Sequence, residues 1–350
     1  MSRTMQAIVK VGPQSGAELR TVPVPEIGAA DVLVRVRAAS ICGTDLHIYK
    51  WDPWAARRIH PPLVFGHEFC GVVEKVGAEV AAVREGDFVS AEMHVACGRC
   101  YQCQIGQRHI CQHVRIIGID ADGCFAEFVK IPESNIWKID PAIPVDYAAI
   151  LDPLGNAVHT VLAGEIAGLS VAVTGCGPIG LFSVAVAKAS GAAPIFAVEP
   201  HAYRRELAQR VGATLTVNPR DTDPVETVLA ETGGVGTDVV LEMSGNPRGI
   251  RQAFGMLRRG GRISLLGIPS RPMELDLAND VIFKGALVQG INGRRVFETW
   301  YKMQALLKSS ALDLAPLITD RMPLAEFERG MELLLSGNAS KVLLYPIGQS

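Results

Sequence analysis

Four closely spaced cysteines are the first residues in this sequence whose types predict a specific chemistry. They are Cys97, Cys100, Cys103 and Cys111. Two, two and seven residues separate them, so the four thiolates can surround one tetrahedral ion, and a set without an open position is typical of a structural zinc site. A bacterial ferredoxin run has three residues before its last cysteine and a proline after it, whereas here seven residues precede Cys111 and Gln112 follows. We therefore expect a structural zinc lobe at about residues 92–115.

A second group of polar side chains offers mixed metal ligands and a route for protons. It comprises Cys42, Thr44, Asp45, His47, His67 and Glu68. Taken singly, Cys42 is typical of a small core residue and His67 of a hydrogen-bonded structural histidine. Together the group supplies thiolate, imidazole and carboxylate, with polar neighbours suited to proton transfer. We interpret it as a candidate catalytic site.

A glycine-rich turn predicts a nucleotide site. Residues 175–180, Gly-Cys-Gly-Pro-Ile-Gly, follow an apolar run and open a helix. The first glycine permits a tight turn, the second lets the backbone approach a pyrophosphate, and the third allows close packing of helix on strand. Glu199 ends the next apolar run, where a carboxylate accepts hydrogen bonds from ribose hydroxyls and repels a 2′-phosphate. This favours NAD over NADP, although Arg204 and Arg205 lie close by on what otherwise reads as a solvated helix face.

The elements that must position these residues differ between the two parts of the chain. Before about residue 150, the sequence predicts short strands broken by glycine and proline, at Val32–Arg37, Val72–Val76, Phe88–Ser90 and Phe125–Ile131. From about residue 170, strands alternate with helices, at Val171–Thr174, Leu181–Ala189, Ile195–Val198, His201–Val211, Val239–Met243 and Arg262–Leu266. This alternation is typical of βαβ units in a parallel sheet. The last predicted elements are a strand at Val281–Ile291, helices at Phe297–Lys308 and Leu324–Ser336, and a strand at Val342–Tyr345.

Length and composition exclude several classes of protein. The chain has 350 residues, 48% of them hydrophobic, which suits two domains rather than one core. A net charge of −2 argues against a surface that neutralises phosphates, so nucleic acid is not an expected partner. Because there is no apolar run of about 20 residues and no secretion signal, we expect a cytoplasmic protein that does not enter the membrane.

A family resemblance accounts for these motifs together. Residues 66–80 carry the pattern G-H-E-x2-G-x5-G-x2-V, which resembles the signature of the zinc-containing medium-chain alcohol dehydrogenases. The four-cysteine lobe and the glycine-rich turn follow in the order of that family. The resemblance implies an α/β protein with a GroES-like, β-rich catalytic domain at 1–152 and a Rossmann NAD-binding domain, doubly wound around a parallel sheet, at 153–292. Residues 293–350 would return to the catalytic domain.

The resemblance also implies roles for individual residues. A catalytic zinc would be held by Cys42, His67 and Glu68, and Thr44 and His47 would relay a proton to solvent. Asp152 would be an additional zinc ligand or a partner of the substrate. Such a zinc acts as a Lewis acid on the substrate hydroxyl, whose carbon gives hydride to NAD. The implied cofactor contacts are Gly175, Gly177, Ile179, Gly180, Glu199, Arg204, Leu266, Gly267, Ile268, Ile291 and Asn292.

The substrate expectation comes from a longer match. Residues 42–54, with Trp51 and Trp54, and the segment that begins at Asp152 are similar to the threonine-oxidising branch of the family. This implies oxidation of L-threonine at its secondary hydroxyl to 2-amino-3-oxobutyrate, and a homotetramer. Two features depart from that branch: residue 199 is Glu rather than Asp, and the spacing around residues 278–280 is one residue longer. The alternatives are a polyol or other secondary-alcohol dehydrogenase and, from another class, a nucleotide-binding homologue without activity.

Overall fold

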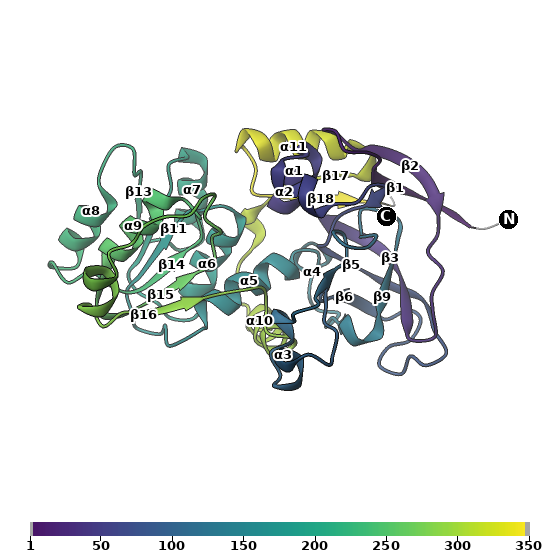
Figure 1. Cartoon of the computed structure of the whole chain (residues 1–350), viewed down its shortest axis with the longest axis horizontal. Coiled ribbons are helices and arrows are strands. Elements are labelled where there is room, and N and C mark those ends of the chain that lie inside the picture. The colour runs from purple at the N-terminus through teal and green to yellow at the C-terminus, as the bar shows by residue number, and fades with distance from the viewer. Residues whose placement is uncertain (1–2, 347–350) are drawn as a thin grey trace. The chain divides into compact units, whose positions relative to one another are not determined.

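A computed structural model describes residues 3–346 (Figure 1). The chain divides into two compact units, each with its own sheet. Unit 1 comprises Met1–Pro153 and Ile318–Ser350, and unit 2 comprises Leu154–Leu317. The division falls within helix α5 (Leu151–Val161). Among residues 3–346, no helix combines the length and the apolar character needed to cross a membrane.

Unit 1 is rich in short strands, as the glycine and proline spacing predicts. Its strands are β1 (Thr4–Lys10), β2 (Glu18–Pro23), β3 (Asp31–Ser40), β4 (Leu63–Val64), β5 (Phe69–Val76), β6 (Phe88–Ala91), β7 (His94–Val95), β8 (Arg115–Ile116), β9 (Phe128–Pro132), β10 (Ile136–Lys138), β17 (Ile318–Pro323) and β18 (Lys341–Tyr345). Its helices are α1 (Gly43–Lys50), α2 (Pro53–Arg58), α3 (Tyr101–Gln104), α4 (Val145–Ala148) and α11 (Phe327–Ser336), with short 3₁₀ turns η1 (Arg108–Ile110), η2 (Glu133–Asn135) and η5 (Leu324–Glu326).

The largest sheet of unit 1 has the order β10-β6-β5-β3-β18-β17, with β9 also paired to β3. In the middle of β3, Val34 and Val36 are buried while Arg35 and Arg37 are exposed, the alternation that is typical of a half-buried strand. Strand β18, drawn in yellow in Figure 1, pairs with β3 near the opposite end of the chain. The C-terminal segment therefore completes the sheet that the N-terminal segment begins.

Unit 2 is a doubly wound α/β unit. Its strands are β11 (Val171–Thr174), β12 (Ile195–Val198), β13 (Leu215–Val217), β14 (Thr237–Glu242), β15 (Leu257–Leu265) and β16 (Leu287–Gly290). Its helices are α6 (Pro178–Ala189), α7 (Ala202–Arg210), α8 (Pro224–Glu231), α9 (Pro247–Met256) and α10 (Glu298–Lys308), with a π-helix η3 (Leu277–Ile282) and a 3₁₀ turn η4 (Ala315–Leu317). The strands are parallel in the order β13-β12-β11-β14-β15-β16, with the reversal beside β11 that defines a dinucleotide-binding sheet.

Several segments differ from the sequence prediction in their bounds; strand β15, for example, begins at Leu257 instead of Arg262. Only Leu287–Gly290 forms a strand in the expected Val281–Ile291, because Asp276 caps a helical turn upstream and Gly285 adopts φ +58° between the two elements. The strand expected from Phe125 begins at Phe128, after a single bridge between Ala126 and Ala7. The helix expected from Leu324 begins at Phe327, after the turn η5.

The contacts also place the start of the C-terminal return later than residue 293. Residues 293–317 belong to unit 2, and the return begins at Ile318. Trp300 and Met303 of α10 are fully buried, and the buried Arg294 donates to the Asn156 side chain over 3.2 Å. These contacts hold the segment within the nucleotide-binding unit.

Candidate metal centres and nucleotide pocket

Cys42, His67 and Glu68 form the first candidate metal centre, in unit 1. Their ligand atoms all lie within 4.8 Å of one another. Strand β3 ends just before Cys42, which caps α1, and His67 and Glu68 immediately precede β5, the neighbour of β3. Adjacent strand ends thus bring a thiol, an imidazole and a carboxylate together, a donor set that fits zinc.

Asp45 contacts two of the three candidate ligands, Cys42 and His67. Its Oδ2 accepts a hydrogen bond from the Cys42 amide over 2.8 Å, and its Oδ1 lies 3.4 Å from His67 Nδ1. Burial opposes a charged ring, but the Asp45 carboxylate and the Cys42 thiolate together raise the pKa of His67 well above its ordinary value. With Nδ1 facing Asp45, Nε2 is the nitrogen left to bind a metal.

The two carboxylate oxygens of Glu68 differ in their hydrogen-bond partners. Its Oε2 is engaged by the hydroxyl of Ser40 and the ammonium of Lys341. Its Oε1 is buried and, among residues 3–346, accepts no hydrogen bond. A buried carboxylate oxygen without a donor is costly unless a cation faces it, so this atom also fits a metal ligand.

The predicted proton route leads outward from Cys42 along α1. The Thr44 hydroxyl lies 3.9 Å from Cys42 Sγ, and the His47 side chain is 58% exposed. His47 Nδ1 lies 2.5 Å from Asp52 Oδ2. Although partial burial opposes the charge, the Ala55 amide and His47 hold the pKa of Asp52 below its usual value. Asp52 therefore remains an anion that orients the His47 ring.

Asp152, expected as a ligand or substrate partner, lies outside the cluster of ligand atoms. It occupies the first turn of α5 and is 7% exposed. Among residues 3–346, the cluster with mutual distances within 4.8 Å consists of Cys42, His67 and Glu68. Asp152 therefore stays a candidate for either a further ligand or a substrate partner.

The four predicted cysteines form the second candidate metal centre. All four sulfur atoms lie within 4.8 Å of one another, and none is in a disulfide. Backbone amides of Cys103 and Gln112 lower the pKa of the Cys100 thiol to about 6. Burial, and then the neighbouring sulfurs, raise that of Cys103 to about 12. A divalent cation would remove this conflict, because it compensates four thiolates at once, so the lobe fits a structural zinc.

The nucleotide pocket lies at the carboxyl ends of the unit 2 strands. It has a volume of about 440 Å³ and is lined partly by Gly175, Gly177, Glu199 and Arg204. Gly175 has φ +82°, and a Cβ on Gly180 would lie 2.0 Å from the Gly175 carbonyl oxygen. A Cβ on Gly177 would meet no atom within 4 Å, so the backbone there is open to a phosphate at the start of α6.

Glu199 is held rigidly at the end of β12. Its Oε2 accepts from the Cys176 amide over 2.8 Å and its Oε1 from the His201 amide over 3.0 Å, which leaves further lone pairs for ribose hydroxyls. The Arg205 guanidinium donates to the carbonyls of Glu199 and Pro200 and so has a structural role. Arg204, in contrast, lines the pocket.

The prediction from sequence missed other residues of this pocket. They include Arg220, Ser244, Asn246 and Arg248. Asn246 caps α9 by accepting from the Arg248 and Gly249 amides. A polar cap after an apolar strand is the signal that could have found this edge.

Several predicted cofactor contacts lie outside the lining of this pocket. Ile179 and Gly180, in the first turn of α6, are two of them. The others are Leu266, Gly267 and Ile268, which follow β15, and Ile291 and Asn292, which follow β16. These five share the carboxyl edge of the sheet with Gly175, because all six strands are parallel.

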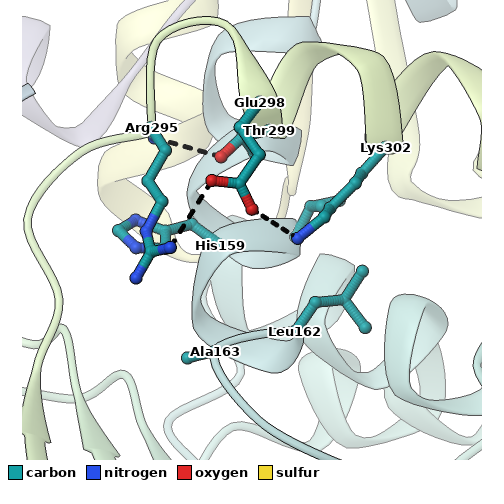
Figure 2. A pocket seen from close by; sticks show the side chains of 8 residues that line it. His159, Leu162, Ala163, Arg295, Glu298, Thr299 and Lys302 are labelled. Atoms are coloured by element: carbon teal, nitrogen blue, oxygen red, sulfur yellow. Dashed lines mark hydrogen bonds and ion pairs between the residues drawn. The ribbon is translucent and has the colours of Figure 1, made fainter. Parts of the chain in front are cut away.

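A smaller cavity of about 30 Å³ in unit 2 lies between α5 and α10 (Figure 2). His159 Nδ1 lies 2.8 Å from the Gly293 carbonyl, and burial lowers the pKa of His159, so a neutral ring donates this bond. Figure 2 shows the Glu298 carboxylate between Arg295 and Lys302. Its Oε2 lies 3.4 Å from Arg295 Nη1, and its Oε1 lies 2.6 Å from Lys302 Nζ. The His159–Gly293 bond ties the segment before α10 to α5, which agrees with residues 293–317 belonging to unit 2, whereas the two Glu298 ion pairs lie within α10 and the residues just before it.

Comparison with known proteins identifies the family of the chain. Residues 28–141 match the alcohol dehydrogenase GroES-like domain, and residues 178–309 match the zinc-binding dehydrogenase domain. L-threonine 3-dehydrogenase of Bacillus licheniformis is 51% identical over 99% of this chain and 100% of its own length. The chain belongs to the zinc-binding dehydrogenases. The enzyme of the same name from Symbiobacterium thermophilum is 53% identical over 99% of each chain.

The fold comparison extends to solved structures of zinc-binding dehydrogenases. A putative member from Sinorhizobium meliloti, bound to NADP, superposes with a TM-score of 0.91, at 31% identity over 99% of this chain and 100% of its own. The α/β architecture expected for this dehydrogenase, a GroES-like domain and a Rossmann-like domain, is thereby confirmed. The zinc chemistry expected from its cysteine, histidine and glutamate motifs agrees with the family.

Proposed function

We propose that this dehydrogenase is a zinc- and NAD-dependent L-threonine 3-dehydrogenase. L-threonine and NAD⁺ are converted to 2-amino-3-oxobutyrate, NADH and a proton. The observation that carries the proposal is the full-length similarity, near 50% identity, to several proteins named for this activity. The metal cluster of unit 1 and the nucleotide pocket of unit 2 provide the two cofactor sites that the reaction needs.

The chemistry divides between the cofactors and the side chains. Bound zinc supplies Lewis acidity, which lowers the pKa of an oxygen that it binds. Cys42, His67 and Glu68 would hold that zinc, with Asp45 fixing the His67 ring. Cys97, Cys100, Cys103 and Cys111 would hold the structural zinc. NAD, when bound, would supply the hydride acceptor for the carbon that carries the hydroxyl.

The hydroxyl proton leaves through the chain's own residues. Thr44, beside Cys42, is the first group that can accept and pass on a proton. His47 is the next, and its exposed ring can pass the proton on to water. The Asp52 carboxylate, 2.5 Å from Nδ1, holds the orientation of the His47 ring.

Substrate recognition requires a partner for each charge of the amino acid. Asp152, buried in the first turn of α5, is our candidate for the ammonium group. A carboxylate placed to pair with an ammonium favours an amino acid over a plain alcohol, because only the amino acid makes this ion pair. Asp152 would thus contribute to specificity for an amino acid.

We further propose a cytoplasmic homotetramer. The strand β16 lies at the edge of the parallel sheet of unit 2, and Leu287 and Val288 are 59% and 39% exposed. An apolar edge strand of this kind is stabilised by pairing with a second copy.

A substrate panel tests the activity. NADH formation is followed by absorbance with L-threonine, a close β-hydroxy amino acid, 2-butanol and sorbitol. We expect robust activity with threonine, weaker activity with the second amino acid and little with either alcohol. Asp152→Asn should raise KM for threonine, lower kcat, or both. Far better oxidation of sorbitol than of threonine by the metal-loaded enzyme would replace this proposal with a polyol dehydrogenase.

A further inference from the structure

The candidate zinc ligand Glu68 is held by two residues from distant parts of unit 1. Its Oε2 contacts both the Ser40 hydroxyl and the Lys341 ammonium, and Lys341 also donates to the Ile41 carbonyl over 3.0 Å. The side chains of Glu68 and Lys341 are 0% and 1% exposed. The ion pair is therefore shielded from water. Its Coulomb energy is larger in this buried environment than it would be at the surface, because water does not screen it.

The sheet explains why these three residues meet. Ser40 is the last residue of β3, Glu68 directly precedes β5, and Lys341 is the first residue of β18. Strand β3 pairs with both of the others. The contact is thus fixed by backbone pairing on both sides, rather than by a mobile surface lysine.

The contact divides the Glu68 carboxylate into an anchored and a free oxygen. Because Oε2 is occupied by Ser40 and Lys341, only the unpartnered Oε1 is left for the cluster with Cys42 and His67. Glu68 could coordinate a metal with both oxygens only if its Oε2 gave up the contact with Lys341. The anchoring therefore sets both the number of Glu68 oxygens available and the charge that they carry.

Lys341 also completes the charge balance of the centre. With a metal bound, the negative groups would be the thiolate of the half-buried Cys42 and the buried carboxylates of Asp45 and Glu68. Zinc compensates two of these charges, and the Lys341 ammonium compensates the third. Without the lysine, the zinc-loaded centre would be one charge more negative in a poorly screened environment.

We propose that Lys341, with Ser40, is a positioning residue that restrains Glu68 to one oxygen at the catalytic zinc and keeps that zinc electrophilic. This inference rests on the zinc site of the proposed function. The positive charge of the lysine repels a zinc ion and so opposes tight zinc binding. The same charge stabilises a negative oxygen and so favours release of the substrate's hydroxyl proton.

Lys341→Met tests the proposal, with Lys10→Met as the matched control. Lys10 is also fully buried in unit 1, but its ammonium contacts the backbone carbonyls of Gln14 and Gly16 and the Trp51 ring instead of a carboxylate. Three measurements are made on the full-length holoenzyme: zinc loss to a chromophoric chelator, the visible spectrum with Co²⁺ at the catalytic site, and the pH profile of kcat/KM. Zinc in the four-cysteine lobe serves as the internal reference.

For Lys341→Met we expect catalytic zinc to be lost about tenfold more slowly. The Co²⁺ bands should shift, and the rising limb of the pH profile should move to higher pH. Lys10→Met should change neither the zinc loss nor the Co²⁺ bands. Ser40→Ala, which removes one bond from the same oxygen, should cause a smaller shift of the same sign, and it tests the proposal if Lys341→Met does not fold. In a Glu68→Gln background, Lys341→Met should alter the Co²⁺ bands no further.

Two results would overturn the inference. One is a Lys341→Met enzyme whose zinc loss, Co²⁺ bands and pH profile match those of Lys10→Met. The other is zinc loss that is faster than in the unmodified enzyme. If instead the unmodified chain holds only the zinc of the four-cysteine lobe, the zinc site of the proposed function fails.

Discussion

The Glu199 carboxylate lies in the nucleotide pocket together with three positively charged side chains. Arg204, Arg220 and Arg248 line the same pocket. The carboxylate repels a 2′-phosphate while the guanidinium groups attract one, so cofactor choice depends on which side chain meets the ribose. Two backbone amides fix Glu199 in place, whereas Arg220 and Arg248 are exposed. The fixed carboxylate therefore decides in favour of NAD.

Replacing Glu199 with alanine should narrow the preference for NAD by about tenfold or more. The change removes both the acceptor for the ribose hydroxyls and the repulsion of a 2′-phosphate, and it leaves the arginines in place. The measurement is kcat/KM with NAD and with NADP at saturating threonine. Glu206→Ala, which removes an exposed carboxylate from the neighbouring helix α7, is the control. Equal efficiency of the unmodified enzyme with both cofactors would contradict the prediction.

His47→Asn should lower kcat most near neutral pH and less at high pH. Asparagine cannot carry a proton, but hydroxide can remove one as the pH rises. The pKa of Asp52 is lowered in the folded protein, so its carboxylate is charged throughout the neutral and alkaline range and loses its charge only at acidic pH. The pH dependence thus reports on residue 47. A parallel decrease of kcat at every pH would argue against a relay.

Single residues could be predicted only where their signal is local. His67 and Glu68 are adjacent in a recognisable motif, and Glu199 follows a strand at the expected distance. Lys341 is 273 positions from Glu68, and only the pairing of β18 with β3 reveals that it is buried against a carboxylate. Arg220 and Arg248 belong to no motif, because they reach the pocket through loops and caps after their strands.

At the scale of elements, the four-cysteine lobe has little structure of its own to stabilise it. It consists of the short helix α3, the turn η1 and the two-residue strands β7 and β8. Its hydrophobic cluster contains the cysteines themselves with a few small neighbours. A segment without a large apolar core depends on its metal for folding energy.

Cys100→Ser should therefore lower thermal stability more than it affects chemistry at the catalytic zinc. One lost thiolate leaves an incomplete tetrahedron around the ion. The measurements are zinc content per chain and the midpoint of thermal unfolding. Cys70→Ser changes a buried cysteine outside both clusters and should retain both zinc ions. A Cys100→Ser protein with one zinc fewer and unchanged unfolding would contradict a structural role.

Elements with a strong pattern could be predicted closely. Strands β11 and β12 begin and end where the apolar runs do, because turns bound them on both sides. The segment Val281–Ile291 was predicted wrongly over most of its length, since an apolar run does not distinguish a strand from a helical turn. The local contacts decided it: Asp276 bonds the amide and the side chain of Asn279 and begins the π-helix η3. The extra residue near 278–280 falls within this helix.

At the scale of the whole molecule, the π-helix and the edge strand leave one apolar surface on unit 2. Ile282 and Phe283 are each 69% exposed, and Leu287 and Val288 follow them closely in the chain, on the edge strand β16. We call these four residues the edge patch. Exposed apolar residues on and near an unpaired strand edge are typical of an interface between subunits.

Val288→Lys in the edge patch should dissociate the proposed tetramer into smaller species. A lysine on an edge strand disfavours strand pairing, because its charge would be buried against an identical charge in a symmetric interface. Sedimentation velocity at micromolar concentration measures the mass of the unmodified and substituted proteins. Val235→Lys is the control, since Val235 is 62% exposed in the same unit but lies outside the edge patch. The lysine at 288 perturbs an interface and no core residue. The midpoint of thermal unfolding should therefore change little, although the mass of the assembly falls. An unmodified protein that sediments only as the 37.5 kDa monomer would rule out the assembly, and a Val288→Lys tetramer would place its interface elsewhere.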